Sequence, residues 1–397
     1  MVNTLDHLPL LPLFVYYSSQ YLASTVPKQD ELGIYHTLRL HGRICHLELA
    51  LSPSISHKVL ALMNDNFPIL EHLSVSCSFS LDSRHRLPLT LPKTFLAPNL
   101  RHLTLFGIGL PKRLRVLTST VSLVTLNLSN IQTSSYFRPR LLAARLRSLS
   151  LLEELTVTFS IPIPRPSTER ELLGEQGAPI TLPSLKTLEF DGVVAYLESL
   201  VAQIRVPLLE QFTVRLFNQI AFVLPHLSHL INNTKVFKFS KATVGFHHDK
   251  VYISTVHVHG SGRIPFYLCV RCKPLDWQID CAAQICHGLI HTLSDVEQLS
   301  LVIGYQEIVP TEMRNGGIDS ATWHDLLRAF IGVKKLHIIG DALSEELSHA
   351  LQEDEVGLDP EFLPNLRSIT ARRDLFTLFI DARQVVGRPV AYPSNHS

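Results

Sequence analysis

The stretch APNLRHLTLFG, residues 97–107, decides the fold, because a close copy of it, LPSLKTLEFDG, stands at residues 182–192. Each copy has a proline, a polar residue, apolar residues spaced three and then two apart, and a glycine. Residues two apart in a strand point to the same face of a sheet, so the last two apolar residues of each copy share one face. One such strand cannot bury that face alone, whereas neighbouring parallel strands can bury it together.

The same apolar spacing, L-x-x-L-x-L with other apolar residues at some positions, recurs along most of the chain. It returns roughly every 20–40 residues, within or just beyond the period of leucine-rich repeats. Between the copies, mixed apolar and polar periodicity predicts helices over residues 137–149, 195–204, 279–293 and 321–331. The clear copies lie at residues 44–49, 70–75, 100–105, 123–128, 152–157, 185–190, 209–214, 296–301 and 333–338, with weaker copies at 237–239, 253–258 and 366–369.

A strand, a turn and a helix, repeated along the chain, predict an α/β fold of the leucine-rich-repeat solenoid type. Its curved parallel sheet would line the concave side, and its helices the convex side. We expect an irregular N-terminal segment over residues 1–40, the solenoid over residues 41–386 and a flexible tail over residues 387–397. The alternative is two or three separate α/β domains, because the spacing is uneven and the copies are weakest between residues 235 and 290.

The exit of each predicted strand is a tight turn. Two positions after the last apolar residue stand Gly107, Asn130, Gly192, Gly260 and Gly340. These residue types tolerate the positive φ that such turns require. Prolines shortly before several copies would end the preceding helix.

The composition limits the classes of partner. Apolar residues make up 46% and charged residues 18% of the 397 residues, which supplies a core and excludes wholesale disorder. The net charge is +1, so nucleic acid is not an expected partner. No apolar run has the length of a membrane span, so no membrane partner is expected. Six cysteines are too few for a disulfide framework here, and we expect reduced thiols in an intracellular protein, cytoplasmic or nuclear.

Several longer stretches carry a family resemblance: FPILEHLSV (67–75), LPKTFLAPNLRHLTLFGIGLPKRLRVL (91–117), FRPRLLAARLRSL (137–149), IPIPRPSTERELLGEQGAPITLPSLKTL (161–188) and CKPLDWQIDCAAQIC (272–286). Over residues 36–390 the chain resembles fungal F-box proteins with divergent leucine-rich repeats. The resemblance implies repeats that hold a substrate, and an F-box that docks the adaptor of a cullin-type ubiquitin ligase. An F-box is not evident in this sequence, and one interpretation of residues 1–40 is a truncated remnant of it.

Polar residues alternate with the buried apolar residues of each predicted strand, and they would line the concave surface. Small hydroxyl groups and scattered charges dominate these positions. Such a surface suits recognition of a protein or peptide through many shallow contacts. The predicted binding residues are His72, His102, Thr104, Asn127, Thr156, Glu189, Thr213, Arg215 and His257.

Two groups of residues raise the question of a metal. Cys269-x-x-Cys272 has the spacing of a zinc-ligand pair, but Cys281 and Cys286 lie five apart in a predicted amphipathic helix, which favours buried thiols. His257-x-His259 lies on one strand face with no carboxylate at a fixed spacing. The sequence therefore predicts no metal site and no cofactor, and it contains none of the common catalytic motifs.

The leading functional prediction is a non-catalytic protein-interaction module that resembles the substrate-recognition part of an F-box ubiquitin-ligase receptor. Its partners would be a protein substrate or peptide, and a cullin-ligase adaptor if an F-box is encoded upstream. Two alternatives stay open. One is an enzyme or metal site in the irregular region 235–290, and the other is a repeat-only decoy without ligase docking.

Overall fold

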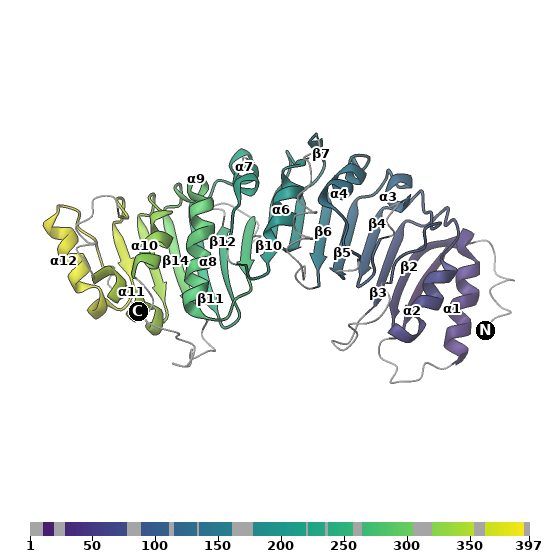
Figure 1. Ribbon diagram of the computed structural model, residues 1–397, viewed down its shortest axis with the longest axis horizontal. Helices are drawn as coiled ribbons and strands as arrows, with labels where there is room; N and C mark the ends of the chain where they lie inside the picture. Colours follow the sequence, from purple (N-terminus) through teal and green to yellow (C-terminus); the bar gives the residue numbers. More distant parts are fainter. Residues whose placement is uncertain are drawn as a thin grey trace. The chain divides into compact units, whose positions relative to one another are not determined.

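The computed structural model describes residues 11–19, 28–77, 89–110, 115–132, 135–160, 178–219, 221–234, 237–256, 264–304, 320–352 and 362–392 (Figure 1). The chain divides into two compact units, residues 1–209 and 210–397, where the sequence predicts one region from 41 to 386. Among the described residues, no helix combines the length and the apolar character needed to cross a membrane.

The sheet of the first unit is parallel, and its strands follow one another in chain order. A separate short parallel pair is formed by β7 (Ile180–Thr181) and β9 (Ile204–Arg205). The strands of the main sheet are β1 (Leu13–Ser18), β2 (Ile44–Leu51), β3 (His72–Cys77), β4 (His102–Phe106), β5 (Thr125–Ile131), β6 (Glu154–Phe159) and β8 (Thr187–Gly192).

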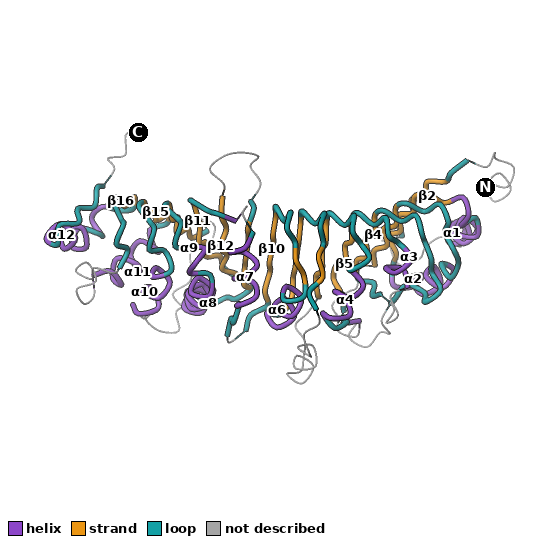
Figure 2. Tube along the Cα trace, turned by 90° about the horizontal axis from the view of Figure 1, so that it is seen from above, coloured by secondary structure: helices purple, strands orange, loops and turns teal. Residues whose placement is uncertain are grey.

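The helices of the first unit lie on one side of its sheet (Figure 2). Pro53 and Pro139 stand in the first turns of α2 and α4, where a missing N–H costs nothing and the fixed φ suits a helix. The predicted helices at 137–149 and 195–204 correspond to α4 and α6. The helices are α1 (Lys28–Arg39), α2 (Pro53–Leu62), α3 (Arg115–Ser119), α4 (Pro139–Leu146) and α6 (Val194–Val201), with a 3-10 turn at His41–Arg43.

The second unit has the strand order β10-β13-β12-β11-β14-β15-β16. These strands are β10 (Gln211–Leu216), β11 (Lys241–His247), β12 (Lys250–Val256), β13 (Phe266–Val270), β14 (Gln298–Ile303), β15 (Lys335–Ile339) and β16 (Ser368–Thr370). Its helices are α7 (Pro225–Asn233), α8 (Leu275–Gly288), α9 (Ile290–Leu293), α10 (Ser320–Arg328), α11 (Asp341–Gln352) and α12 (Thr377–Val385), with a 3-10 turn at Arg373–Leu375. Both units are therefore α/β with a mostly parallel sheet, as predicted.

One part of the second unit differs from the predicted parallel arrangement. Strand β12 is antiparallel to both β11 and β13, whereas β10 pairs with β13 and β11 with β14 in parallel. The cause is the short connection between β11 and β12, in which only His248 and Asp249 separate the strands. A two-residue loop can join antiparallel neighbours, whereas parallel strands need a long crossover. The weak motif copy at 253–258 is therefore a hairpin strand in its described part.

The apolar positions of the motif form the core. Leu100, Leu103 and Leu105 are each 0% exposed, and the matching positions of the other clear copies are also buried. These side chains are removed from water on the helix side of the sheet, and this burial is the main contribution to the stability of a fold built from stacked strands and helices.

The same backbone hydrogen bond recurs between residues at the starts of neighbouring strands. In the first unit, the N–H of Glu71 donates to the carbonyl of Cys45 at 2.9 Å, and the N–H of Arg101 donates to the carbonyl of Glu71 at 2.8 Å. In the second unit, the N–H of Lys334 donates to the carbonyl of Glu297 at 2.8 Å. Equivalent residues of neighbouring motif copies therefore make equivalent contacts.

The turn prediction is correct at some positions and wrong at one. Gly107, Asn130 and Gly340 have positive φ, at 69°, 56° and 117°. Gly192 does not, and a Cβ there would lie 2.7 Å from the ring of Phe190, so close packing explains this glycine. Gly260 lies outside the described residues.

The two ends of the chain also differ from the prediction in their described parts. Residues 1–40, expected to be irregular, contain β1 and α1, and β1 pairs in parallel with β2. In the predicted tail 387–397, Ala391 forms a bridge with Ser368, and Val390 is buried. The backbone of β1 pairs with that of β2, and the backbone of Ala391 pairs with that of β16. Each pairing gives hydrogen-bond partners to backbone N–H and C=O groups that would otherwise lack them at the edge of a sheet.

Candidate functional site

The side of the first unit's sheet that is opposite the buried leucines carries a series of polar side chains. We call it the polar sheet face of the first unit. None of its members is buried, and each alternates with a buried apolar residue along its strand. Its members are His46, Glu48, His72, Ser74, His102, Thr104, Thr125, Asn127, Glu154, Thr156, Thr187 and Glu189.

Parallel pairing places these side chains in rows that cross the strands. Directly paired residues in one row bring together Phe14, His46, His72, His102, Thr125, Glu154 and Thr187. A row of this kind depends on an in-register sheet, because a shift by one residue would turn every side chain to the other face. We call His46, His72 and His102 the histidine row.

The imidazole rings of the histidine row lie against one another. The ring centroids of His46 and His72 are 4.2 Å apart, and the ring planes differ by 6°. Those of His72 and His102 are 5.8 Å apart. On the other side of His46, the ring of Tyr16 lies 5.0 Å away and that of Phe14 lies 5.8 Å away. The result is a strip of stacked and tilted aromatic rings across β1 to β4.

Glu48 provides the negative charge beside this strip. Its Oε1 lies 2.9 Å from Nε2 of His46 and 3.6 Å from Nε2 of His72. The pKa of His72 is lowered from its ordinary value mainly by burial and then by the neighbouring His46, while Glu48 opposes this shift. At neutral pH this environment favours a neutral His72 imidazole, which can use a ring nitrogen as an acceptor or a metal ligand.

At the β4 end of the histidine row, hydrogen bonds connect His102 to polar side chains of the next two strands. Nδ1 of His102 lies 3.2 Å from Oγ1 of Thr125, and this hydroxyl in turn donates to Oε2 of Glu154 at 3.5 Å. The hydroxyl of Ser129 donates to Oδ1 of Asn127 on the same strand. These contacts hold the polar side chains in defined orientations.

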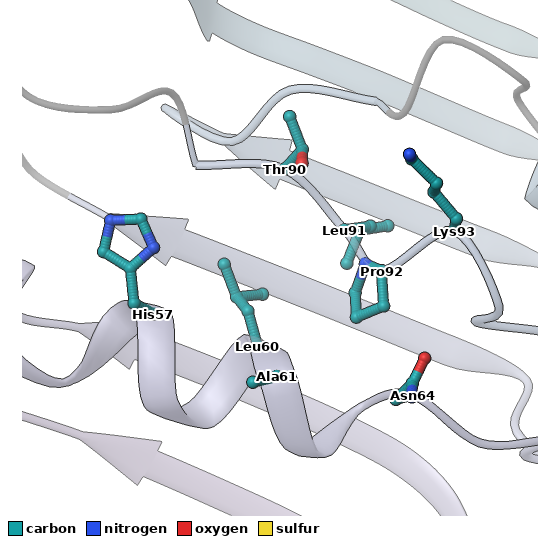
Figure 3. A pocket seen from close by; sticks show the side chains of 8 residues that line it. All are labelled: His57, Leu60, Ala61, Asn64, Thr90, Leu91, Pro92 and Lys93. Atoms are coloured by element: carbon teal, nitrogen blue, oxygen red, sulfur yellow. The ribbon is translucent and has the colours of Figure 1, made fainter.

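Described residues of the first unit line two hollows that bear on a binding site. One, of about 300 Å³, borders Glu48 on the polar sheet face and is also lined by Tyr16, Ser18, Ser74 and Ser76. The other, of about 420 Å³, lies between α2 and residues 90–93 (Figure 3). In Figure 3 the side chains of His57 and Lys93 lie at opposite ends of this second hollow, with Leu60 and Leu91 between them. The first hollow is the one that adjoins the charged groups of the polar sheet face.

The structure brings six of the predicted binding residues together on this face. They are His72, His102, Thr104, Asn127, Thr156 and Glu189, on β3, β4, β5, β6 and β8. Thr213 and Arg215 lie on β10 in the second unit, where they also alternate with buried residues. His257 lies outside the described residues.

Sequence reasoning missed His46 and Glu48. The motif copy at Ile44, Leu47 and Leu49 places these two residues at the same strand positions as His72 and Ser74 in the next copy. The alternation rule that selected His72 therefore selects His46 and Glu48 as well. What the sequence pattern does not supply is the close approach of His46, Glu48 and His72, which needs the strand register.

The cysteine-rich region of the second unit is part of the core. All six cysteines of the chain are free thiols, and Cys269, Cys272, Cys281 and Cys286 are buried. The pKa of the Cys281 thiol is raised mainly by a hydrogen bond with Cys272 and further by burial. Among the described residues, no cysteine joins a group of three side chains placed to hold a metal ion, and the one group of that kind is His46, Glu48 and His72.

Comparison with models of known protein families and with curated proteins gives no match.

Proposed function

We propose that the polar sheet face of the first unit binds a segment of a partner protein. The observation that carries the proposal is the division of each strand into apolar residues on the helix side and polar residues in register on the other side. The predicted binding function uses this same surface. A rigid parallel sheet presents such side chains at fixed spacing, which suits recognition through many contacts.

The proposal includes the interpretation of the fold as a series of leucine-rich repeats. It is supported by the motif spacing and by the backbone hydrogen bonds that recur between equivalent residues in both units. On this interpretation the chain is a leucine-rich-repeat solenoid, and the polar sheet face lies on its concave side.

The chemistry of the face favours a partner with both aromatic and polar groups. At the β1 end, Phe14 and Tyr16 are 67% and 65% exposed and can act as apolar anchors. Toward β8, Glu154 and Glu189 offer carboxylates that suit basic side chains. An extended segment that crosses the strands would meet both regions.

Ligase docking is the part of the proposal that rests on the resemblance to F-box proteins. The proposed role is that of a substrate receptor, in which the repeats hold a protein and an F-box brings the ligase. A repeat-only decoy would bind the same protein without the adaptor. Recovery of the adaptor and the cullin with the chain therefore separates these two roles.

The experiment compares proteins recovered with the tagged chain and with two sheet-face variants, Thr104→Arg and Thr156→Arg. Both positions are partly exposed on the polar sheet face, so an added guanidinium blocks a partner without entering the core. We expect a defined set of proteins to be lost from both variants. Quantitative mass spectrometry of the recovered material measures this loss.

The matched control is Ala144→Arg, which adds the same group to an exposed position of α4 on the helix side. This variant should keep the partners. A partner set that is unchanged in both sheet-face variants, or that is lost equally in the control, would contradict binding by this face.

A further inference from the structure

We infer that His46, Glu48 and His72 form a binding site for a divalent zinc ion. One possible ligand atom from each residue lies within 4.8 Å of the other two, and all three side chains are partly accessible. The sequence pattern predicts no metal site, and its metal alternative lies in region 235–290, so this inference departs from both. It also goes beyond protein binding, because it names an inorganic ligand and three donor atoms.

The donor types suit zinc. Two imidazole nitrogens and one carboxylate oxygen are the protein ligands of many zinc sites whose fourth position is open. Magnesium and calcium prefer oxygen ligands throughout, so a site with two imidazoles disfavours them. The single negative charge of Glu48 leaves a bound zinc ion with a net positive charge, which attracts a further anionic or polar ligand.

The separations between the donor atoms also suit zinc. Ligand atoms about 2.0–2.1 Å from a tetrahedral zinc ion lie roughly 3.3 Å from one another. The two measured separations from Oε1 of Glu48, 2.9 Å to His46 and 3.6 Å to His72, stand on either side of that value. Because the rings of His46 and His72 are stacked with their planes 6° apart, one imidazole must turn about its side-chain torsions before both ring nitrogens point at the same ion.

The backbone holds the donors in position. His46 and His72 are directly paired residues of neighbouring parallel strands, and Glu48 lies two residues after His46 on the same face. The side chains of His46, His72 and Glu48 are 19%, 30% and 44% exposed. The imidazoles are thus supported by their neighbours, while solvent can reach the site.

The hollow beside Glu48 leaves space for a fourth ligand of the zinc ion. Ser18, Ser74, Ser76 and Tyr16 are among the residues that line it. Water can fill this space and complete a tetrahedral set of ligands. A side-chain carboxylate or imidazole of a bound protein could take the same position.

A simpler explanation is that Glu48 only makes hydrogen bonds to the two histidines. Both explanations predict that the three side chains lie close together. They differ in whether the purified chain takes up one zinc ion that depends on all three residues.

The test uses the full chain, freed of metal with a chelator and then titrated with zinc chloride at pH 7.5. We expect one zinc ion per chain with an affinity that falls in His46→Ala, Glu48→Gln and His72→Ala. The fall should exceed the roughly 10–100-fold effect of losing a merely supporting hydrogen bond to a metal ligand. Isothermal titration calorimetry measures both stoichiometry and affinity.

The controls are His57→Ala and His337→Ala. His57 lies at an exposed position of α2, and His337 lies on β15 of the second unit, and neither belongs to the three-donor group. Both variants should bind zinc as the wild type does. Circular dichroism identifies any variant that fails to fold, and for such a variant His46→Gln and His72→Gln replace the alanine changes.

Cobalt substitution supplies a second measurement. Cobalt bound by the three donors and water should give the visible absorption of a four- or five-coordinate ion, and Glu48→Gln should lose it. Wild type that takes up no zinc, or zinc uptake that is the same in all three donor variants, would overturn the inference. Loss of partner proteins in the sheet-face variants is a separate outcome, so the two proposals can fail independently.

Discussion

The side-chain amide of Asn99 donates a hydrogen bond to the backbone carbonyl of Pro68 at 2.7 Å. Asn365 makes the equivalent bond to the carbonyl of Ile331 at 3.0 Å in the second unit. In both cases the donor stands just before the first apolar residue of a motif copy, and the acceptor precedes the neighbouring strand. One polar contact is thus repeated between stacked copies.

Replacing Asn99 by alanine should lower the free energy of unfolding by about 0.5–1.5 kcal/mol, the usual net contribution of one hydrogen bond. Denaturant unfolding measures the change. Asn365→Ala should show a loss of similar size in the second unit. If neither variant loses stability, the hydrogen bonds of Asn99 and Asn365 to these carbonyl groups are no stronger than the hydrogen bonds that water makes to them.

Leu103 and Thr104 are neighbours on β4 that test the assignment of the two sheet faces. Leu103 is fully buried, so Leu103→Ala should cost about 2–5 kcal/mol through lost burial and the cavity left behind. Thr104 lies on the polar sheet face, and Thr104→Ala should change stability by less than about 0.5 kcal/mol. Equal effects in thermal unfolding would contradict the alternation along β4.

Gly332 lies where two backbone segments approach closely. A Cβ at this position would lie 2.1 Å from the carbonyl oxygen of Ser294, which belongs to the backbone and cannot rotate away. Gly332→Ala should therefore destabilise the second unit by about 1–3 kcal/mol, the usual cost of overpacking.

Gly33 provides the opposite case. It lies inside α1, and a Cβ there would meet no atom within 4 Å. Gly33→Ala should stabilise the first unit by about 0.5–1 kcal/mol, because alanine favours a helix more than glycine does. A melting temperature that rises for this variant and falls for Gly332→Ala is the expected pair of results. The same direction for both would show that space around the glycine does not decide the effect.

The stability of the second unit should depend on pH through His337. Burial lowers the pKa of this imidazole, and the ammonium groups of Lys335 and Lys241 lower it further. The unfolded state therefore binds the proton more readily than the folded state, so protonation favours unfolding. Stability is expected to fall as the pH drops below about 6.5, the ordinary pKa of histidine, and to stop falling at the folded-state pKa.

His337→Gln should reduce this slope between pH 7 and pH 5 in denaturant unfolding. His57→Gln, at an exposed position of α2, is the control for loss of a histidine. A slope that is unchanged in His337→Gln would exclude this imidazole as the source.

The sequence predicts the buried half of the strands well, because burial follows directly from the apolar spacing. Leu103, Leu155 and Leu188 lie on parallel strands and are buried as expected. Strand β1 was missed, because LPLLPLFVYY contains two prolines and lacks the motif. The reversal of β12 was missed, because alternating apolar residues are the same for a strand that runs in either direction.

The candidate metal site could be predicted only in part. The strand positions of His46, Glu48 and His72 follow from the motif copies at 44–49 and 70–75. Their closeness requires His46 to pair directly with His72, and strand register is a property of the assembled sheet. The same holds for Lys186 and Glu153, whose charged atoms lie 2.9 Å apart although the residues are distant in the chain.

The different strand orders of the two units have a consequence for how quickly each assembles. In the first unit each strand of the main sheet pairs with the next one along the chain, so ordering can begin at any copy and spread. In the second unit Phe212 pairs with Phe266, and this contact must wait until the intervening chain has closed a long loop. We expect the β11–β12 hairpin to form early and its docking onto β13 to limit the rate. Pulse-labelled hydrogen exchange during refolding should then protect β3 to β6 before β10, and the reverse order would contradict this mechanism.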